Sequence, residues 1–443
     1  MFCINVVLTF KNTKLTFMLA ILGILSIGFI LVLIMSKKVS AIVALVLVPF
    51  VMGVIGGFGT ELFQFMTEGI KTISATAVMF IFAILFFGIL TDAGTFKPII
   101  RWMLRRAGND SARVAVATAL LAMIVHLDGS GAVTFLVTIP ALLPIYDALG
   151  MKRSTLATIV ALAAGTMNVL PWGGPTLRAA SALGVPVMEL FSPMLIPVLA
   201  GLLLVVLLAY RMGAKERSFI EFKDLPSATE ERPSEWERPR LFFVNIFLII
   251  ISISALLSGI APPHIIFILA FSVALLINYP NLKIQAERIN HHAKSALLMA
   301  GILFAAGCFT GILKGSGMID AMAEATVAYI PNWIGSHLAV ITGLVSMPAS
   351  MLFDPDSFYF GILPLLGSTA AHFGVDAIEV GRAAICGQMT TGFPISPLTG
   401  STYLLVGLTG IDLGDHQRKC FPYAFLVTVV ILVVALIVGA ISL

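Results

Sequence analysis

The sequence predicts an all-α polytopic membrane protein made of two inverted-topology repeats, each with a hairpin-like run and a broken helix. The first observation is composition: of the 443 residues, 59% are hydrophobic and only 11% are charged, and the mean hydropathy is +1.03. Soluble domains carry about 25% charged residues. The second observation is a motif rich in Pro and Gly that interrupts a membrane-length apolar run twice, 223 residues apart.

The membrane segments are indicated by stretches without Asp, Glu, Lys or Arg. A helix needs roughly 20 apolar residues to cross a bilayer. The charge-free stretches are residues 39–60, 72–91, 154–177, 190–210, 241–282, 295–313, 325–353, 383–411 and 420–443. Residues 241–282 are enough for two helices. With an N-terminal span at 17–35, the segment 114–127 and hairpin-like runs after Asp128 and Asp356, the sequence predicts 11 to 13 membrane segments.

The interrupted motif has the same layout in both halves. Pro171-Trp-Gly-Gly-Pro-Thr176 matches Pro394-Ile-Ser-Pro-Leu-Thr399, and the glycines and acidic residues that follow keep the same offset of 223. Unwound backbone at membrane depth survives only where it is buried in protein or lines a wet cavity. Broken apolar segments at corresponding places of two halves indicate the substrate site of a secondary transporter.

The repeats divide the chain into four parts. The first membrane repeat covers residues 18–211 and the second covers 241–443, and a hydrophilic stretch at 212–240 holds six Lys or Arg and seven Asp or Glu. We interpret this stretch as a solvated cytoplasmic linker. Residues 1–17 precede the first repeat and are interpreted as an N-terminal extension that is either dispensable or not native.

Basic loops predict the direction of the segments. The loop after residue 91 is rich in positive charge and is predicted to be cytoplasmic. Its basic residues are Lys97, Arg101, Arg105, Arg106 and Arg113. The equivalent loop after residue 313 has one lysine followed by two acidic residues, and it reads as external. Matching segments are therefore expected to run in opposite directions. An inverted repeat of this kind places a shared site near the midplane of the membrane.

Two candidate clusters lie at the expected hairpins. The first contains Asp128, Ser130 and Thr134, and the second contains Asp354 and Asp356. A carboxylate at membrane depth is costly and disfavoured unless it has a role, so we interpret the three aspartates as sites of metal or proton coupling. The alternative is that they only cap the helices that follow.

The third cluster is the first broken helix, where Asn168, Gly173, Gly174 and Thr176 precede Arg178. A half-helix N-terminus favours anionic groups, and an arginine can bind a carboxylate through two hydrogen bonds. We therefore predict that this cluster binds substrate. The alternative for Arg178 is that its side chain reaches to the membrane interface.

The fourth cluster is the second broken helix, which is rich in hydroxyl groups. These suit a hydroxylated carboxylate or a hard cation, and packing of helices through small residues is the alternative. The predicted substrate-binding residues here are Thr390, Thr391, Ser396, Thr399, Ser401 and Thr402.

Several classes of protein are disfavoured. The chain has no Walker A motif, no HExxH stretch and no nucleophile with a base beside it, so neither an ATP-driven pump nor an enzyme is expected. Its four cysteines fall in no metal-ligand spacing. The formal net charge of +4 does not suggest a nucleic-acid partner. A channel is disfavoured because inverted repeats with hairpins suit alternating access.

Four stretches carry a resemblance to a known family: Leu127–Met151, Met167–Leu183, Thr390–Thr402 and Leu413–Gln417. On these motifs the chain resembles the citrate–metal:proton symporter (CitMHS) family of the ion transporter superfamily. The resemblance implies proton-driven symport of citrate complexed with a divalent metal ion of the Mg²⁺ or Ca²⁺ class. It also implies a fold with two re-entrant hairpins and two broken helices, as a multi-pass homodimer in the plasma membrane with no permanently bound cofactor.

Other carriers of the same superfamily remain open. A sodium- or proton-coupled di- or tricarboxylate carrier would use the same layout, as would a cation/proton antiporter. Arg178 beside a half-helix N-terminus favours an organic anion over a bare cation.

Overall fold

The computed structural model describes residues 2–36, 38–108, 110–216, 234–327 and 329–443. Every regular element within these ranges is helical, which confirms the predicted all-α class. Eight helices are long and apolar enough to cross a membrane, and three shorter apolar helices accompany them. The described helices therefore agree with the lower end of the predicted 11 to 13 segments.

The first half contains ten α-helices and two short 3-10 turns. In order they are α1 (Phe2–Met35), α2 (Ala41–Ile55), α3 (Glu61–Asp92), α4 (Lys97–Ala107), α5 (Ser111–Val125), η1 (His126–Asp128), α6 (Gly131–Ala148), α7 (Arg153–Met167), α8 (Gly174–Leu183), α9 (Val187–Phe191), η2 (Ser192–Met194) and α10 (Leu195–Lys215).

The second half contains the remaining elements. In order they are η3 (Pro239–Leu241), α11 (Phe242–Ser258), α12 (Pro263–Asn278), α13 (Leu282–Gly315), α14 (Met318–Val327), α15 (Asn332–Gly335), α16 (Leu338–Ala349), η4 (Ser357–Ile362, a π-helix), α17 (Leu363–His372), α18 (Ala377–Ile385), α19 (Gly400–Thr409) and α20 (Leu413–Ile437).

The order of elements in the second half repeats that of the first. For example, α3 ends at Asp92 and α13 ends at Gly315, again 223 residues apart. In each half a helical hairpin is followed by a helix pair that is broken by irregular backbone: α7 and α8 in the first half, α18 and α19 in the second. The opposite orientation of the two halves stays a prediction.

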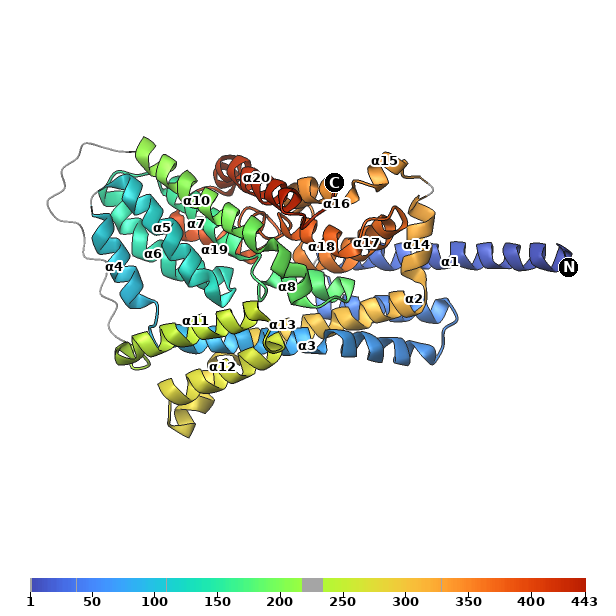
Figure 1. Ribbon diagram of the computed structural model, residues 1–443, viewed down its shortest axis with the longest axis horizontal. Coiled ribbons are helices and arrows are strands. Elements are labelled where there is room, and N and C mark those ends of the chain that lie inside the picture. Colours follow the sequence, from blue (N-terminus) through green and yellow to red (C-terminus); the bar gives the residue numbers. More distant parts are fainter. Residues whose placement is uncertain (1, 37, 109, 217–233, 328) are drawn as a thin grey trace.

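The helices form two layers (Figure 1). One layer contains α2, α3 and α11–α13, and the other contains α5–α8, α10 and α16–α20. The long helices α3 and α13 pack along each other, and a Cβ added at Gly69 would overlap the carbonyl oxygen of Gly307. The absence of a side chain at Gly69 therefore allows the backbones to touch.

The limits of the predicted linker differ slightly from the structure. Helix α10 continues to Lys215, so the first residues of the predicted 212–240 linker are helical, and residues 217–233 lie outside the described ranges. The end of the linker docks on the first layer, where the Arg238 amide donates to the carbonyl oxygen of Ala93 at 2.9 Å. The predicted N-terminal extension begins α1, and the side chains of residues 1–15 are not described.

Candidate functional site

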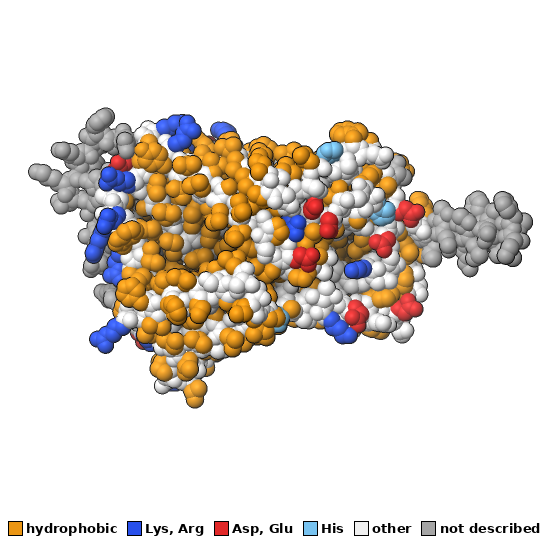
Figure 2. Space-filling view, in the orientation of Figure 1, with side chains coloured by type: hydrophobic (Ala, Val, Ile, Leu, Met, Phe, Trp, Pro, Cys, Tyr) orange, Lys and Arg blue, Asp and Glu red, His pale blue; other side chains and the backbone are white. Residues whose placement is uncertain are grey.

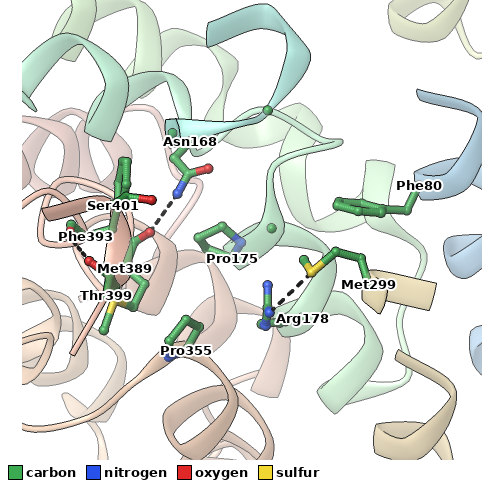
Figure 3. A pocket seen from close by; sticks show the side chains of 13 residues that line it. Phe80, Asn168, Pro175, Arg178, Met299, Pro355, Met389, Phe393, Thr399 and Ser401 are labelled. Atoms are coloured by element: carbon green, nitrogen blue, oxygen red, sulfur yellow. Dashed lines mark hydrogen bonds between the residues drawn. The ribbon is translucent and has the colours of Figure 1, made fainter. Parts of the chain in front are cut away.

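A cavity of about 180 Å³ lies where the hairpins and broken helices of both halves meet (Figure 3). Residues from α3 and α13 complete its wall. Its lining consists of Phe80, Gly129, Gly131, Asn168, Gly174, Pro175, Arg178, Met299, Pro355, Met389, Phe393, Thr399 and Ser401. Each of the four clusters singled out in the sequence thus contributes at least one residue or an immediate neighbour.

Arg178 is the charged residue in the cavity wall, and its partner comes from the other half of the chain. Its Nε donates to Oδ1 of Asp356 at 2.7 Å, and the two side chains are only 8% and 14% exposed. Its Nη2 lies 3.8 Å from the sulfur of Met299 on α13. The predicted anion-binding arginine is therefore held in an ion pair inside the protein and does not reach to the membrane interface.

The two broken helices are joined directly at the cavity. Asn168 follows the end of α7, and its Nδ2 donates to the carbonyl oxygen of Met389 at 2.8 Å. Met389 has φ +51°, a conformation that a non-glycine residue rarely adopts. This turn aims the Met389 carbonyl at the first half. Strain of this kind clusters at binding sites.

The first broken helix turns at two glycines, and the backbone leaves no room for a side chain at Gly173. A Cβ at Gly173 would overlap the carbonyl oxygen of Asn168, and a Cβ at Gly174 would lie 2.9 Å from Nη1 of Arg178. The side chain of Thr176 turns away from the cavity and donates to the carbonyl oxygen of Val169 at 2.8 Å. Thr176 therefore closes the broken turn and does not line the cavity.

Hairpin one, where η1 leads into α6, is stabilised by hydrogen bonds of its own polar residues. Asp128 accepts the Ser130 amide at 2.7 Å, and the Ser130 hydroxyl accepts the amide of Val133 as the N-cap of α6. The indole of Trp172 donates to the carbonyl oxygen of Leu127 at 2.8 Å, which anchors the hairpin tip to the broken helix. Asp128 and Ser130 therefore stabilise the turn that carries the cavity residues on either side of Ser130.

Hairpin two is built in a similar way. Asp354 accepts the amide and the hydroxyl of Ser357, each at 2.9 Å, and Pro355 lines the cavity. Asp354 stabilises the turn of this hairpin, whereas Asp356 forms the ion pair with Arg178 of the first half. The two aspartates therefore have different partners, although they are two residues apart.

The remaining predicted hydroxyl residues divide into two groups. Thr399 and Ser401 line the cavity. The others do not line the cavity, and most form hydrogen bonds within the protein. Thr134 bonds to His126, Thr391 to Thr428, Ser396 to the carbonyl oxygen of Ser350, and Thr402 to the carbonyl oxygen of Phe393. The buried Thr390 hydroxyl has no hydrogen-bond partner among the described residues. The second broken helix thus offers fewer side-chain ligands than its composition indicates.

Several cavity residues were not predicted from the sequence. Phe80 and Met299 come from α3 and α13, and an apolar residue inside a long apolar helix has no signal that sets it apart. Phe393 stacks on Phe135, with ring centroids 6.0 Å apart and planes at 5°. The apolar flanks beside a buried arginine and polar backbone suit a small organic anion.

The apolar helices and the cavity between two repeated halves define a multi-pass membrane carrier. A family model described as citrate transporter (CitMHS) matches residues 29–387, and the chain belongs to this family. A protein of Bacillus subtilis named citrate transporter is 44% identical over 96% of this chain and 100% of its own length. Another, named Mg(2+)/citrate complex secondary transporter, is 43% identical over 96% of this chain and 99% of its own length.

Two solved structures share the fold. The YdaH transporter of Alcanivorax borkumensis has a TM-score of 0.60 and 16% identity, with 85% of this chain and 86% of that chain covered. MtrF of Neisseria gonorrhoeae has a TM-score of 0.59 and 15% identity, with 87% and 86% covered. The family and the named relatives are transporters, which confirms the prediction of a carrier over an enzyme.

Proposed function

We propose that this chain is a secondary active transporter of the plasma membrane that takes up citrate as a complex with a divalent metal ion, in symport with protons. The names of its relatives support citrate as the substrate. The observation that carries the finer proposal is the Arg178–Asp356 pair, because Arg178 lines the cavity and its partner Asp356 directly follows the lining residue Pro355.

The pair favours a complex over free citrate. A citrate carboxylate that took Arg178 would leave Asp356 buried without a partner, and breaking a buried pair in this way costs about 3–5 kcal/mol. A metal–citrate complex offers both charges, because its free carboxylate can bind the guanidinium while its cation attracts Asp356. The complex also has less net charge than bare citrate, so enclosing it away from water costs less.

The metal is part of the cargo. Oxygen atoms of carboxylates, amides, hydroxyls and backbone carbonyls are the ligands that Mg²⁺ and Ca²⁺ prefer. The cavity lining offers this set in Asn168, Thr399, Ser401 and the backbone of Met389, and Asp356 adds a carboxylate as the partner of the lining residue Arg178. This donor set supports a hard cation as the partner of citrate.

The hairpin aspartates are the proposed sites of proton coupling. Asp128 and Asp354 form no ion pair in the described part of the chain, and each is followed directly by a residue that lines the cavity. A carboxylate without a fixed counter-charge can take up and release a proton when the cavity changes the side to which it opens. Asp356 is less suited because Arg178 already neutralises it.

Uptake of labelled citrate into proteoliposomes tests the proposal. With an imposed proton gradient, uptake should require Mg²⁺ or Ca²⁺, fall in excess chelator and fall with an uncoupler, and citrate counterflow should persist without a gradient. Equal uptake of free citrate in chelator would exclude the complex as the cargo. Dependence on a sodium gradient instead would favour a sodium-coupled carboxylate carrier.

A further inference from the structure

A second group of metal-ligating side chains lies at the end of α3, and none of its members lines the cavity. Asp92 is the last residue of α3, and His291 and His292 come from the facing part of α13. One ligand atom from each of the three residues lies within 4.8 Å of the others. Nε2 of His292 is 2.9 Å from Oδ2 of Asp92, and the two imidazole rings are perpendicular with centroids 4.8 Å apart.

The group has no counterpart in the other half of the chain. The residues equivalent to Gly88 and His292, at the offset of 223, are Gly311 and Gly69. Those two glycines bring the helices into backbone contact, and a Cβ on either would overlap the other helix. At the end of α3 near Asp92, the two equivalent positions are Gly88 and His292, so the imidazole ring of His292 fills the space between the helices.

The His292 ring packs directly against Gly88. A Cβ added at Gly88 would lie 2.7 Å from Nδ1 of His292 and 2.8 Å from its Cε1. The residue equivalent to Asp92 is Gly315, which faces Phe65 on the opposite helix. The α3–α13 pair therefore has the polar group at one end, whereas the equivalent positions at the other end are packed with glycine and phenylalanine.

The nearby arginine is partly engaged elsewhere. Nη1 of Arg288 is 3.4 Å from Oδ2 of Asp92, while its guanidinium stacks on Trp236 with 3.9 Å between the carbon Cζ and the ring centroid. Trp236 belongs to the docked end of the linker, which packs beside this group. A cation that took Asp92 would therefore compete with Arg288 and change the contact that the linker makes with α13.

One side of the group is uncovered by the protein, because His291 is exposed. Asp92 directly precedes the basic loop with Lys97 and Arg101 that is predicted to be cytoplasmic. Most of the Lys and Arg side chains visible in Figure 2 gather at one end of the molecule. Ligands on one tetrahedral zinc ion are about 3.3 Å apart, from metal–ligand bonds of about 2.0–2.2 Å. Small rotations of the three side chains would close the 4.8 Å group to that spacing.

We infer that Asp92, His291 and His292 bind a transition-metal ion of the Zn²⁺, Co²⁺ or Ni²⁺ class, at a site that is separate from the cargo site. Two imidazoles and one carboxylate select these ions over Mg²⁺ and Ca²⁺, which prefer oxygen ligands. Three protein ligands leave a coordination position for water. The bound ion crosslinks the two longest helices of one layer and competes with Arg288, which contacts the linker.

Metal binding to the purified full-length protein in detergent tests the site without citrate or transport. Calorimetric titration with Zn²⁺ should show one saturable site that excess Mg²⁺ does not block. Co²⁺ should give the visible absorption bands of a four- or five-coordinate ion with imidazole ligands. Zn²⁺ should also raise the unfolding temperature of the wild-type protein, because it binds the folded state alone.

Variants separate a built site from chance binding. His292→Gln should weaken Zn²⁺ binding by about 10-fold to 100-fold, and Gly88→Ala should weaken it through displacement of the ring while all three ligands remain. His337→Gln is the matched control, because His337 is an exposed histidine that bonds to its own helical turn. Wild-type protein without a Zn²⁺ site, or equal affinity in all three variants, would overturn the inference and would leave the citrate proposal untouched.

Discussion

The ion pair between Arg178 and Asp356 joins the two halves at the cavity, and its removal has a calculable cost. Asp356→Asn keeps a hydrogen-bond acceptor for Nε but leaves the guanidinium, which is only 8% exposed, without its counter-charge. Breaking a buried pair by removal of one partner costs about 3–5 kcal/mol. We expect a loss near 3 kcal/mol in the free energy of unfolding, about a hundredfold in the folding equilibrium.

A double variant separates stability from function. Arg178→Met with Asp356→Leu replaces both charges by apolar side chains of similar size, which is often neutral or stabilising for a buried pair. This variant should recover most of the free energy of unfolding lost by Asp356→Asn. It should nevertheless take up no metal–citrate, because both groups proposed to bind the complex are gone.

The assay combines SDS titration of the purified protein with citrate uptake in proteoliposomes. Arg153 and Asp147 form the matched control pair, with 2.7 Å between Nη2 and Oδ2 but side chains that are 47% and 42% exposed. Exposed pairs contribute little, so Asp147→Asn should leave both readouts unchanged. Wild-type uptake by the apolar double variant would refute the proposed role of the pair, and unchanged stability of Asp356→Asn would refute the estimate.

Three further predictions follow from the site. Asp128→Asn and Asp354→Asn should abolish uncoupler-sensitive citrate accumulation but retain counterflow, since Asn also caps a turn; unchanged accumulation in both would remove them from the proton pathway. Arg178→Lys should raise the apparent Km for citrate because Lys lacks the planar fork, and normal kinetics would contradict this. Gly165→Ala should cost about 1–3 kcal/mol in the free energy of unfolding, because its Cβ would lie 2.8 Å from the Thr390 carbonyl oxygen; equal stability would contradict the close approach.

Controls for these variants come from positions without a special environment. Gly28→Ala is the match for Gly165→Ala, because a Cβ at Gly28 would meet nothing within 4 Å. Counterflow and expression level serve as the controls for the aspartate variants, since a misfolded protein would lose both. For Arg178→Lys, an unchanged unfolding profile would show that any kinetic change concerns binding.

The sequence by itself was enough to determine the class of protein and the parts that build the cavity. Apolar runs of about 20 residues and a low charge content favour helices as the spanning structure, because a helix satisfies all of its backbone groups within one segment. The repeated breaks at Pro171 and Pro394 marked where backbone is irregular, and the structure places residues beside both breaks in one cavity. These features are local, so they can be read along the chain.

Only the tertiary structure decided which side chains meet. The partner of Arg178 lies 178 residues away, and the backbone partner of Asn168 lies 221 residues away. The same holds for Asp92 and His292, which are 200 residues apart. Contacts of this kind depend on how α3, α8, α13 and the hairpins cross, because a rotation of one helix by about 100° brings a different residue to face its neighbour. Hydrophobicity and Pro–Gly patterns specify which segments span the membrane or are broken, whereas the packing of the helices specifies which residues contact each other.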